Sequence, residues 1–140
     1  MIKSFQLKQF KLYGRGITKI LGELEAEIME IVWQQKISTA REICNHLSRV
    51  RKKALSFNTI MTIMNRLVEK ALLEKRQGEN CYEYKPKLTK REFLDNISNH
   101  VIKDLIKDFK PYVLAHFAEN LDNDDLEELI NLRKKHLREN

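Results

Sequence analysis

The pattern of apolar and polar positions is clearest between residues 55 and 71. Apolar side chains recur there at i, i+3, i+4, i+7 and i+8, namely Ile60, Ile63, Met64, Leu67 and Val68. This is the spacing of one buried helical stripe, so the stretch is predicted to be a helix with one face in a core. The opposite face and its flanks carry Asn58, Thr59, Met61, Thr62, Asn65 and Arg66.

Two shorter helical segments are predicted before this helix. Residues 21–34 form an amphipathic helix with all its glutamates toward water, and residues 36–38 form a short connection with room for one strand. The capping-box sequence Thr39-Ala40-Arg41-Glu42 then opens a second helix, which is expected to run through Ser48. Residues 49–54 are predicted to be a basic connection to the focal helix.

A hairpin is predicted after the focal helix. Residues 72–77 and 81–85 are two strand-like runs around a Gly-Glu-Asn turn. The order is then helix, short strand, helix, helix and hairpin. This is the order of a winged helix-turn-helix, in which the third helix enters the DNA major groove.

The remaining chain is predicted to form amphipathic helices without a core of their own. A long helix runs from about Thr89 to Lys110, Pro111 marks the start of the next, and Asp122 caps the last. Their stripes are best buried against an identical chain, which predicts a symmetric homodimer. The expected dimer contacts are Phe93, Leu94, Ile97, Val101, Leu105, Ile106, Phe109, Val113, Leu114, Phe117, Leu126, Leu129 and Ile130.

The expected fold is therefore mainly α, in three parts. A basic N-terminal extension covers residues 1–20, a winged-helix DNA-binding domain residues 21–87, and a helical dimerisation domain residues 88–140. For the first 19 residues three alternatives stay open: a disordered basic arm, a short segment packed on the domain, or an arm that contacts DNA.

Charge is distributed unevenly along the chain. The net charge is +6, but residues 1–88 carry 17 Lys/Arg against 9 Asp/Glu, whereas residues 89–140 carry 9 against 11. No acid occurs between residues 43 and 68, which favours binding of a polyanion by the focal helix. Base contacts are predicted for Ser56, Asn58, Thr59, Met61, Thr62 and Arg66. Phosphate contacts are predicted for Arg51, Lys52, Lys53, Lys75 and Arg76.

Other function classes find little support in the sequence. An enzyme is disfavoured because the chain has no H-E-x-x-H, G-x-S-x-G or Gly-rich phosphate loop. No cofactor and no metal site are expected, since two cysteines and four histidines would have to gather from unrelated positions. A cytoplasmic protein without direct membrane binding is expected, because long apolar runs are missing. A winged-helix module that binds acidic protein partners stays an alternative.

Two segments resemble the BlaI/MecI/CopY family, the penicillinase-type repressors of bacteria. Residues 21–25, with Ile28-Met29 and Ile31-Val32-Trp33, are similar to that family's opening signature. The second segment resembles its recognition helix in Ser56, Thr59, Thr62, Arg66, Leu67 and Lys70. The resemblance runs from about Leu21 to the C-terminus.

The resemblance implies a dimeric repressor of a pseudo-palindromic operator, often near β-lactam-resistance or metal-homeostasis genes. It also implies a β-lactam-sensing membrane metalloprotease as a partner, with cleavage at a bond that matches His116-Phe117 here. The chain departs from the family at this pair, which is usually Asn-Phe. It departs at Met61, usually polar, and at Ala71, usually Gly, so the turn into the wing is expected to differ. The Cys-x-Cys motif of the copper-responsive branch is absent, which leaves a metal-responsive repressor as the alternative within the fold.

Overall fold

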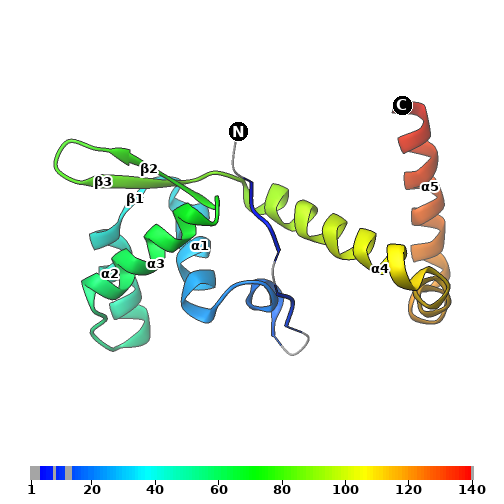
Figure 1. Ribbon diagram of the computed structural model, residues 1–140, viewed down its shortest axis with the longest axis horizontal. Helices are drawn as coiled ribbons and strands as arrows, with labels where there is room; N and C mark the ends of the chain where they lie inside the picture. The colour runs from blue at the N-terminus through cyan, green and yellow to red at the C-terminus, as the bar shows by residue number, and fades with distance from the viewer. Residues whose placement is uncertain (1–3, 8, 12–13, 140) are drawn as a thin grey trace. The chain divides into compact units, whose positions relative to one another are not determined.

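The computed structural model describes residues 4–7, 9–11 and 14–139, and Figure 1 shows the order of its elements. They are η1 (Gly16–Lys19), α1 (Glu23–Gln35), β1 (Ser38–Thr39), α2 (Ala40–Arg51), α3 (Phe57–Glu69), β2 (Leu73–Gln77), β3 (Tyr82–Pro86), α4 (Lys90–Asn120) and α5 (Asn123–Glu139). This order confirms the predicted mainly α fold with a winged helix-turn-helix. The chain divides into two compact units, which meet between Ile97 and Ser98.

The core of the first unit forms where α1, α2 and α3 bury their apolar stripes together. The fully buried side chains include Ile28 of α1, Ile43 and Leu47 of α2, and Ile60, Met64 and Leu67 of α3. The predicted stripe of α3 is thus confirmed at these three positions, while Ile63 and Val68 at its edges are half-buried. Burial of this stripe directs the opposite face of α3 outward.

A small antiparallel sheet with the strand order β1-β3-β2 completes the first unit. β2 and β3 form the predicted hairpin, the wing, and the two-residue strand β1 pairs with the other edge of β3. Tyr84 lies on this central strand, opposite Ser38 of β1 and Lys75 of β2, and its side chain is buried. The hairpin is therefore attached to the helical core through β3.

The end of α2 corrects the prediction for residues 49–54. Instead of a basic connection from Arg49 onward, α2 continues through Arg51, and Lys52 ends it in the left-handed conformation with φ of 53°. The amide of Lys53 then donates to the carbonyl of Ser48. The shorter connection to α3 consequently begins only at Lys52.

Part of the N-terminal extension packs on the first unit. The ring of Phe5 contacts that of Phe93 edge-on, with 5.3 Å between centroids, and Ile17 of η1 is buried. The amide of Lys11 donates to the carbonyl of Lys19. Among the three alternatives, these described residues support the packed segment. Residues 1–3, 8, 12 and 13 lie outside the described part of the chain.

The first unit extends into α4, beyond the expected boundary at residue 87. Trp33 of α1 donates its indole N–H to the carbonyl of Leu88, and its ring lies 5.5 Å from that of Phe93. Phe93 and Ile97 are buried. Both had been assigned to the dimer interface, but their side chains are already covered within the protomer, because the first turns of α4 pack on the winged unit.

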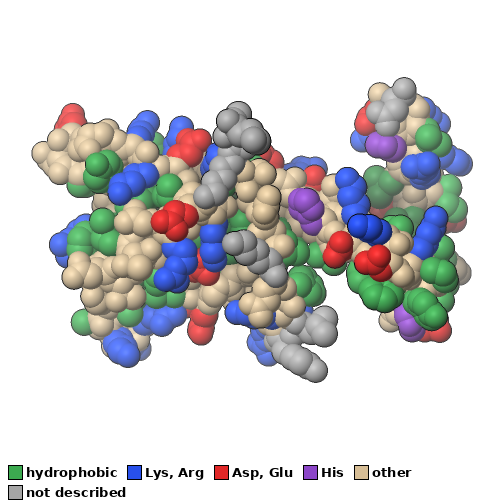
Figure 2. Space-filling view, viewed as in Figure 1, with side chains coloured by type: hydrophobic (Ala, Val, Ile, Leu, Met, Phe, Trp, Pro, Cys, Tyr) green, Lys and Arg blue, Asp and Glu red, His purple; other side chains and the backbone are tan. Residues whose placement is uncertain are grey.

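The second unit consists of the rest of α4 and α5. Phe109 has non-helical dihedral angles (φ −131°, ψ 25°), so α4 is two helices joined by a kink just before Pro111, as predicted. Asp122 accepts from the amide of Asp125 at 2.8 Å and caps α5. None of the described residues of this unit is buried, and Figure 2 shows apolar side chains gathered on its visible surface. Of the helices described, none combines the length and the hydropathy needed to cross a membrane.

Ala71, which lies in the turn between α3 and the wing, provides a test of that turn. Its φ of +64° is rarely adopted by L-residues with a side chain, and its methyl group is buried. Ala71→Gly is expected to raise the free energy of unfolding by about 0.5–1 kcal/mol, because glycine has no Cβ to clash there. Urea denaturation measures the change. Ala54→Gly is the control, since the φ of Ala54 is not positive, and it should not stabilise. Equal destabilisation by both variants would contradict a strained Ala71.

Candidate nucleic-acid interface

The outward face of α3 brings together most of the predicted base-reading residues. An open hollow of about 370 Å³ is lined by Asn58, Thr59, Thr62, Ile63 and Arg66. Four of these five are predicted contacts, and no acid lines the hollow. Ser56 and Met61, the other two, lie outside this lining: Ser56 is the exposed N-cap of α3 and Met61 is half-buried on its flank.

The side chains of this face differ in the hydrogen-bond donors, acceptors and methyl groups that they can present to a base. The hydroxyl of Thr62 donates to the carbonyl of Asn58 at 2.9 Å, so Thr62 presents a methyl group and an acceptor. Asn58 is exposed and its amide has both a donor and an acceptor. Arg66 is exposed and forms no ion pair with a described acid, which leaves its guanidinium available.

The C-terminal end of α3 is held by a carboxylate from α1. Glu25 was expected to face water, but it is buried and its carboxylate accepts from the Lys70 ammonium at 2.6 Å and from the Gly22 amide at 3.0 Å. Burial alone would raise the pKa of Glu25. The hydrogen bonds from Lys70 and Gly22, with the charges of Lys70 and Arg66, outweigh it and bring the pKa below the usual 4.5.

Only some of the predicted phosphate-binding cations are unpaired. Arg51 forms an ion pair with Glu27 of α1, through both Nε and Nη2. Lys52 and Lys53, next in the chain, are exposed and form no ion pair with a described acid. Among these three residues, the two lysines after α2 are therefore the cations most accessible to a polyanion.

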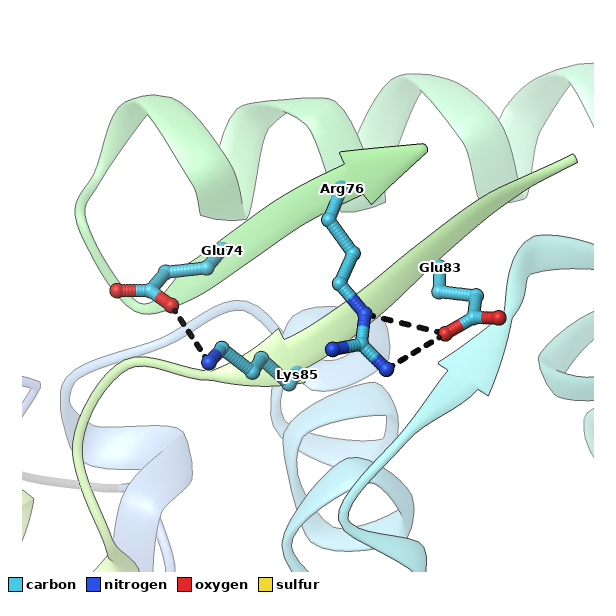
Figure 3. Close-up of polar contacts among 4 residues, drawn as sticks. All are labelled: Glu74, Arg76, Glu83 and Lys85. Carbon is cyan, nitrogen blue, oxygen red and sulfur yellow. Dashed lines mark hydrogen bonds and ion pairs between the residues drawn. The ribbon is translucent and has the colours of Figure 1, made fainter. Parts of the chain in front are cut away.

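The wing carries a charge-balanced face, shown in Figure 3. Arg76 lies opposite Glu83, with 3.0 Å between Nη2 and Oε2, and Glu74 lies opposite Lys85, with 3.3 Å between Oε2 and Nζ. Arg76 was predicted to bind phosphate, and here its guanidinium is engaged by Glu83. Lys75 points to the other face of the hairpin, where its ammonium lies 4.1 Å from the centroid of the Tyr82 ring.

One cation near α3 was missed by the sequence analysis. The guanidinium of Arg41, on the first turn of α2, lies 4.1 Å from the ring centroid of Phe57, the first residue of α3. The capping-box pattern placed Arg41 at the start of a helix. No sequence signal linked it to Phe57, because the contact joins two helices across a connection.

The thiols and histidines form no site in the part of the chain described. Cys44 is buried and donates its S–H to the carbonyl of Leu55, while Cys81 is exposed at the hairpin turn. No group of three or more potential ligands lies close enough to hold a metal ion among these residues.

The helix order, the sheet and the outward face of α3 together define a winged helix-turn-helix protein. The chain belongs to the penicillinase repressor family, whose profile matches residues 21–135. This is a family of repressors and not of enzymes. Residues 1–20, the basic extension, lie outside the match.

Individual relatives are distant but cover most of the chain. Identity is 25% over 117 residues with the methicillin resistance regulatory protein MecI of Staphylococcus aureus (strain N315), which covers 82% of this chain and 94% of that protein. It is 28% over 113 residues with a penicillinase repressor of Staphylococcus aureus, covering 75% and 83%. The solved DNA-binding domain of the repressor BlaI is similar over 56% of this chain and 93% of that domain, with 23% identity and a TM-score of 0.45.

The pairing of Glu25 with Lys70 makes a pH-dependent prediction. Glu25→Gln is expected to lower the free energy of unfolding at pH 7 by roughly 1–3 kcal/mol, since a charge-assisted hydrogen bond is lost. Because the folded-state pKa of Glu25 is lowered, its contribution is present above pH 4.5 and is lost as the pH falls through the folded-state value. Urea denaturation of both proteins between pH 3 and pH 7 should therefore show the difference shrinking toward low pH.

Glu23→Gln is the matched control, because Glu23 is exposed on the same helix. It should change stability little at any pH. A difference between wild type and Glu25→Gln that stays constant down to pH 3 would show that the carboxylate charge is not what stabilises this contact.

Proposed function

We propose that this protein is a homodimeric transcriptional repressor that binds a pseudo-palindromic operator through the outward face of α3. The observation that carries the proposal is the hollow lined by Asn58, Thr59, Thr62 and Arg66, which has no acid and lies on the third helix of a winged unit. An α-helix fits the major groove, where such side chains can contact base edges. The family supports the same class of function.

The side-chain chemistry suggests a division of roles on α3. Arg66 can pair with the two acceptors of guanine, and Asn58 can pair with adenine. Thr62, whose hydroxyl proton is held by the helix backbone, is suited to contact a thymine methyl. Met61 on the flank could do the same. These roles would make Arg66 and Asn58 the main determinants of which DNA sequence the protein prefers.

Phosphate contacts would come first from the unpaired lysines after α2, Lys52 and Lys53. Each phosphate neutralised by a lysine releases counterions, so binding weakens as salt rises. Arg51 and Arg76 can serve only if their ion pairs with Glu27 and Glu83 open. The charge-balanced face of the wing would therefore add less to binding than its cations alone suggest.

The test of base reading compares Arg66→Ala with Lys53→Gln. Arg66→Ala is expected to cost about 1–3 kcal/mol per subunit and to relax discrimination at one base pair of each half-site. Lys53→Gln should weaken binding to all sequences alike and reduce the salt slope by about 1 per subunit, or about 2 for the dimer. Fluorescence titrations would use the intergenic DNA upstream of the gene and single-base variants of it. If Arg66→Ala weakens all these DNAs equally, α3 does not read sequence through Arg66.

Dimerisation is proposed from the exposed apolar side chains of the second unit. Phe109, Leu114, Ile130, Leu132 and Leu137 are each more than half exposed. Apolar patches of this kind are rarely left in water, and a second copy would cover them symmetrically. Of the predicted contacts, Val101, Val113 and Leu126 are half-buried, and Leu94, Leu105, Ile106, Phe117 and Leu129 are exposed.

Leu114→Glu and Ile130→Glu test the dimer in the full chain. Each is expected to weaken self-association by roughly tenfold to a hundredfold, because a charge would be buried in an apolar interface. Operator affinity should fall with it, since dimerisation makes binding of the second half-site intramolecular. Sedimentation equilibrium measures the association. Asn131→Glu, which adds the same charge at an exposed neighbouring position, is the control.

Unchanged self-association in both apolar variants would exclude this surface as the interface. Removal of the whole tail is a less informative experiment. A chain that ended at Lys87 would lose Phe93 and Ile97, which belong to the core of the first unit.

Release from the operator is proposed to act on the tail, with β-lactam-resistance genes as targets. The relatives are named for methicillin resistance and penicillinase repression. Cleavage at His116-Phe117 by a β-lactam-sensing membrane metalloprotease is one route. Both residues lie in the helix after the kink, where the His116 carbonyl accepts from the Asn120 side chain at 2.8 Å. Local opening of this helix would have to precede cleavage.

A further inference from the structure

Three side chains meet where the wing faces α3. The side-chain oxygen of Asn65, on α3, accepts from the Tyr84 hydroxyl at 3.1 Å and from the Lys75 ammonium at 3.3 Å. Tyr84 comes from the central strand β3 and Lys75 from the opposite position of β2. We refer to Asn65, Lys75 and Tyr84 as the helix–wing cluster.

Asn65 is chemically well suited to its position between the other two side chains of the helix–wing cluster. A tyrosine hydroxyl and an ammonium group are both donors, and an amide oxygen has two lone pairs to accept both. Tyr84 is 1% exposed, and burial, with a smaller contribution from Tyr82, raises its pKa above 10.0, so its hydroxyl stays protonated. The ammonium of Lys75 is further held over the ring of Tyr82. Loss of the amide oxygen would leave the Tyr84 hydroxyl without this acceptor.

The helix–wing cluster adds a side-chain attachment between α3 and the hairpin, besides the short turn that joins them and the pairing of β3 with β1. α3 ends at Glu69 and β2 begins at Leu73, and the hairpin extends from there. Asn65 lies one helical turn before the end of α3, and Lys75 in the middle of β2. A hairpin with this additional attachment to α3 has fewer orientations available, so less conformational entropy is lost when both elements bind one ligand.

We propose that Asn65 is a positioning residue that fixes the orientation of the wing relative to α3, and that Lys75 serves this contact instead of binding phosphate. The inference rests on the proposed function, because it concerns how α3 and the wing meet the same operator. It changes the role predicted for Lys75. It also means that Asn65, a polar residue on the outward face of α3, contacts the wing of the same protein and does not contact a base.

The experiment compares Asn65→Leu and Lys75→Met with Lys53→Gln in the full-length protein. Asn65→Leu and Lys75→Met are each expected to weaken binding to the upstream intergenic DNA by about tenfold while the salt slope stays unchanged, because neither removes a phosphate contact. In hydroxyl-radical footprints both should lose protection at the outer flanks, where the wing is expected to contact the backbone, and keep it at the centre of each half-site. Lys53→Gln should instead reduce the slope and keep the footprint.

Lys75→Met keeps the proposal testable if Asn65→Leu fails to fold, since Lys75 is exposed. A slope reduced by about 1 per subunit in Lys75→Met would overturn the proposal, because Lys75 would then bind phosphate. Wild-type affinity and footprints in both variants would overturn it as well. If the wild-type protein itself shows no selective binding, the proposed function fails. The proposal about the helix–wing cluster is then tested by amide hydrogen exchange of the free protein. It predicts at least tenfold faster exchange in the hairpin of Lys75→Met, and unchanged exchange would overturn the proposal.

Discussion

Burial of the apolar stripe of α3 is the interaction on which the rest of the site depends. Ile60, Met64 and Leu67 have no exposed surface, because α1 and α2 cover them. A helix with one face fixed in a core has its opposite face fixed outward. The positions of Asn58 and Arg66 at the hollow thus follow from packing on the far side of the same helix. A polar residue in place of Met64 would destabilise the core and, with it, the position of the outward face of α3.

Acidic residues of α1 form ion pairs with several cations of the first unit, and these cations are therefore less available to a polyanion. Glu25, Glu27 and Glu30 pair with Lys70, Arg51 and Lys90, which lie at the end of α3, the end of α2 and the start of α4. One helix is therefore joined to three others by ion pairs. On the wing, Glu74 and Glu83 have a similar effect on Lys85 and Arg76. Of the predicted DNA-contacting cations, Arg51 and Arg76 are thus engaged by acids, whereas Lys52, Lys53 and Arg66 are exposed and form no ion pair with a described acid.

Periodicity predicted the elements well because it depends on local sequence. The stripe of α3, the hairpin and the break before Pro111 all show in short windows, and four of the six predicted base-reading residues share one hollow. Contacts between distant residues could not be predicted in this way. Glu25 and Lys70 are 45 positions apart, and nothing near Glu25 distinguishes it from the other glutamates of α1. Likewise, an apolar stripe on a helix does not reveal whether it packs within the same chain, as Phe93 does, or on a second chain.

The central claim is that the outward face of α3 recognises a particular DNA sequence. Competition titration of the wild-type protein measures this most directly, with labelled intergenic DNA from upstream of the gene and unlabelled random duplex at physiological salt. A sequence-specific repressor should prefer the upstream DNA by about 10³-fold or more. Equal competition by both duplexes, with the same steep salt dependence, would mean that the protein binds only the phosphate backbone, and would contradict the account.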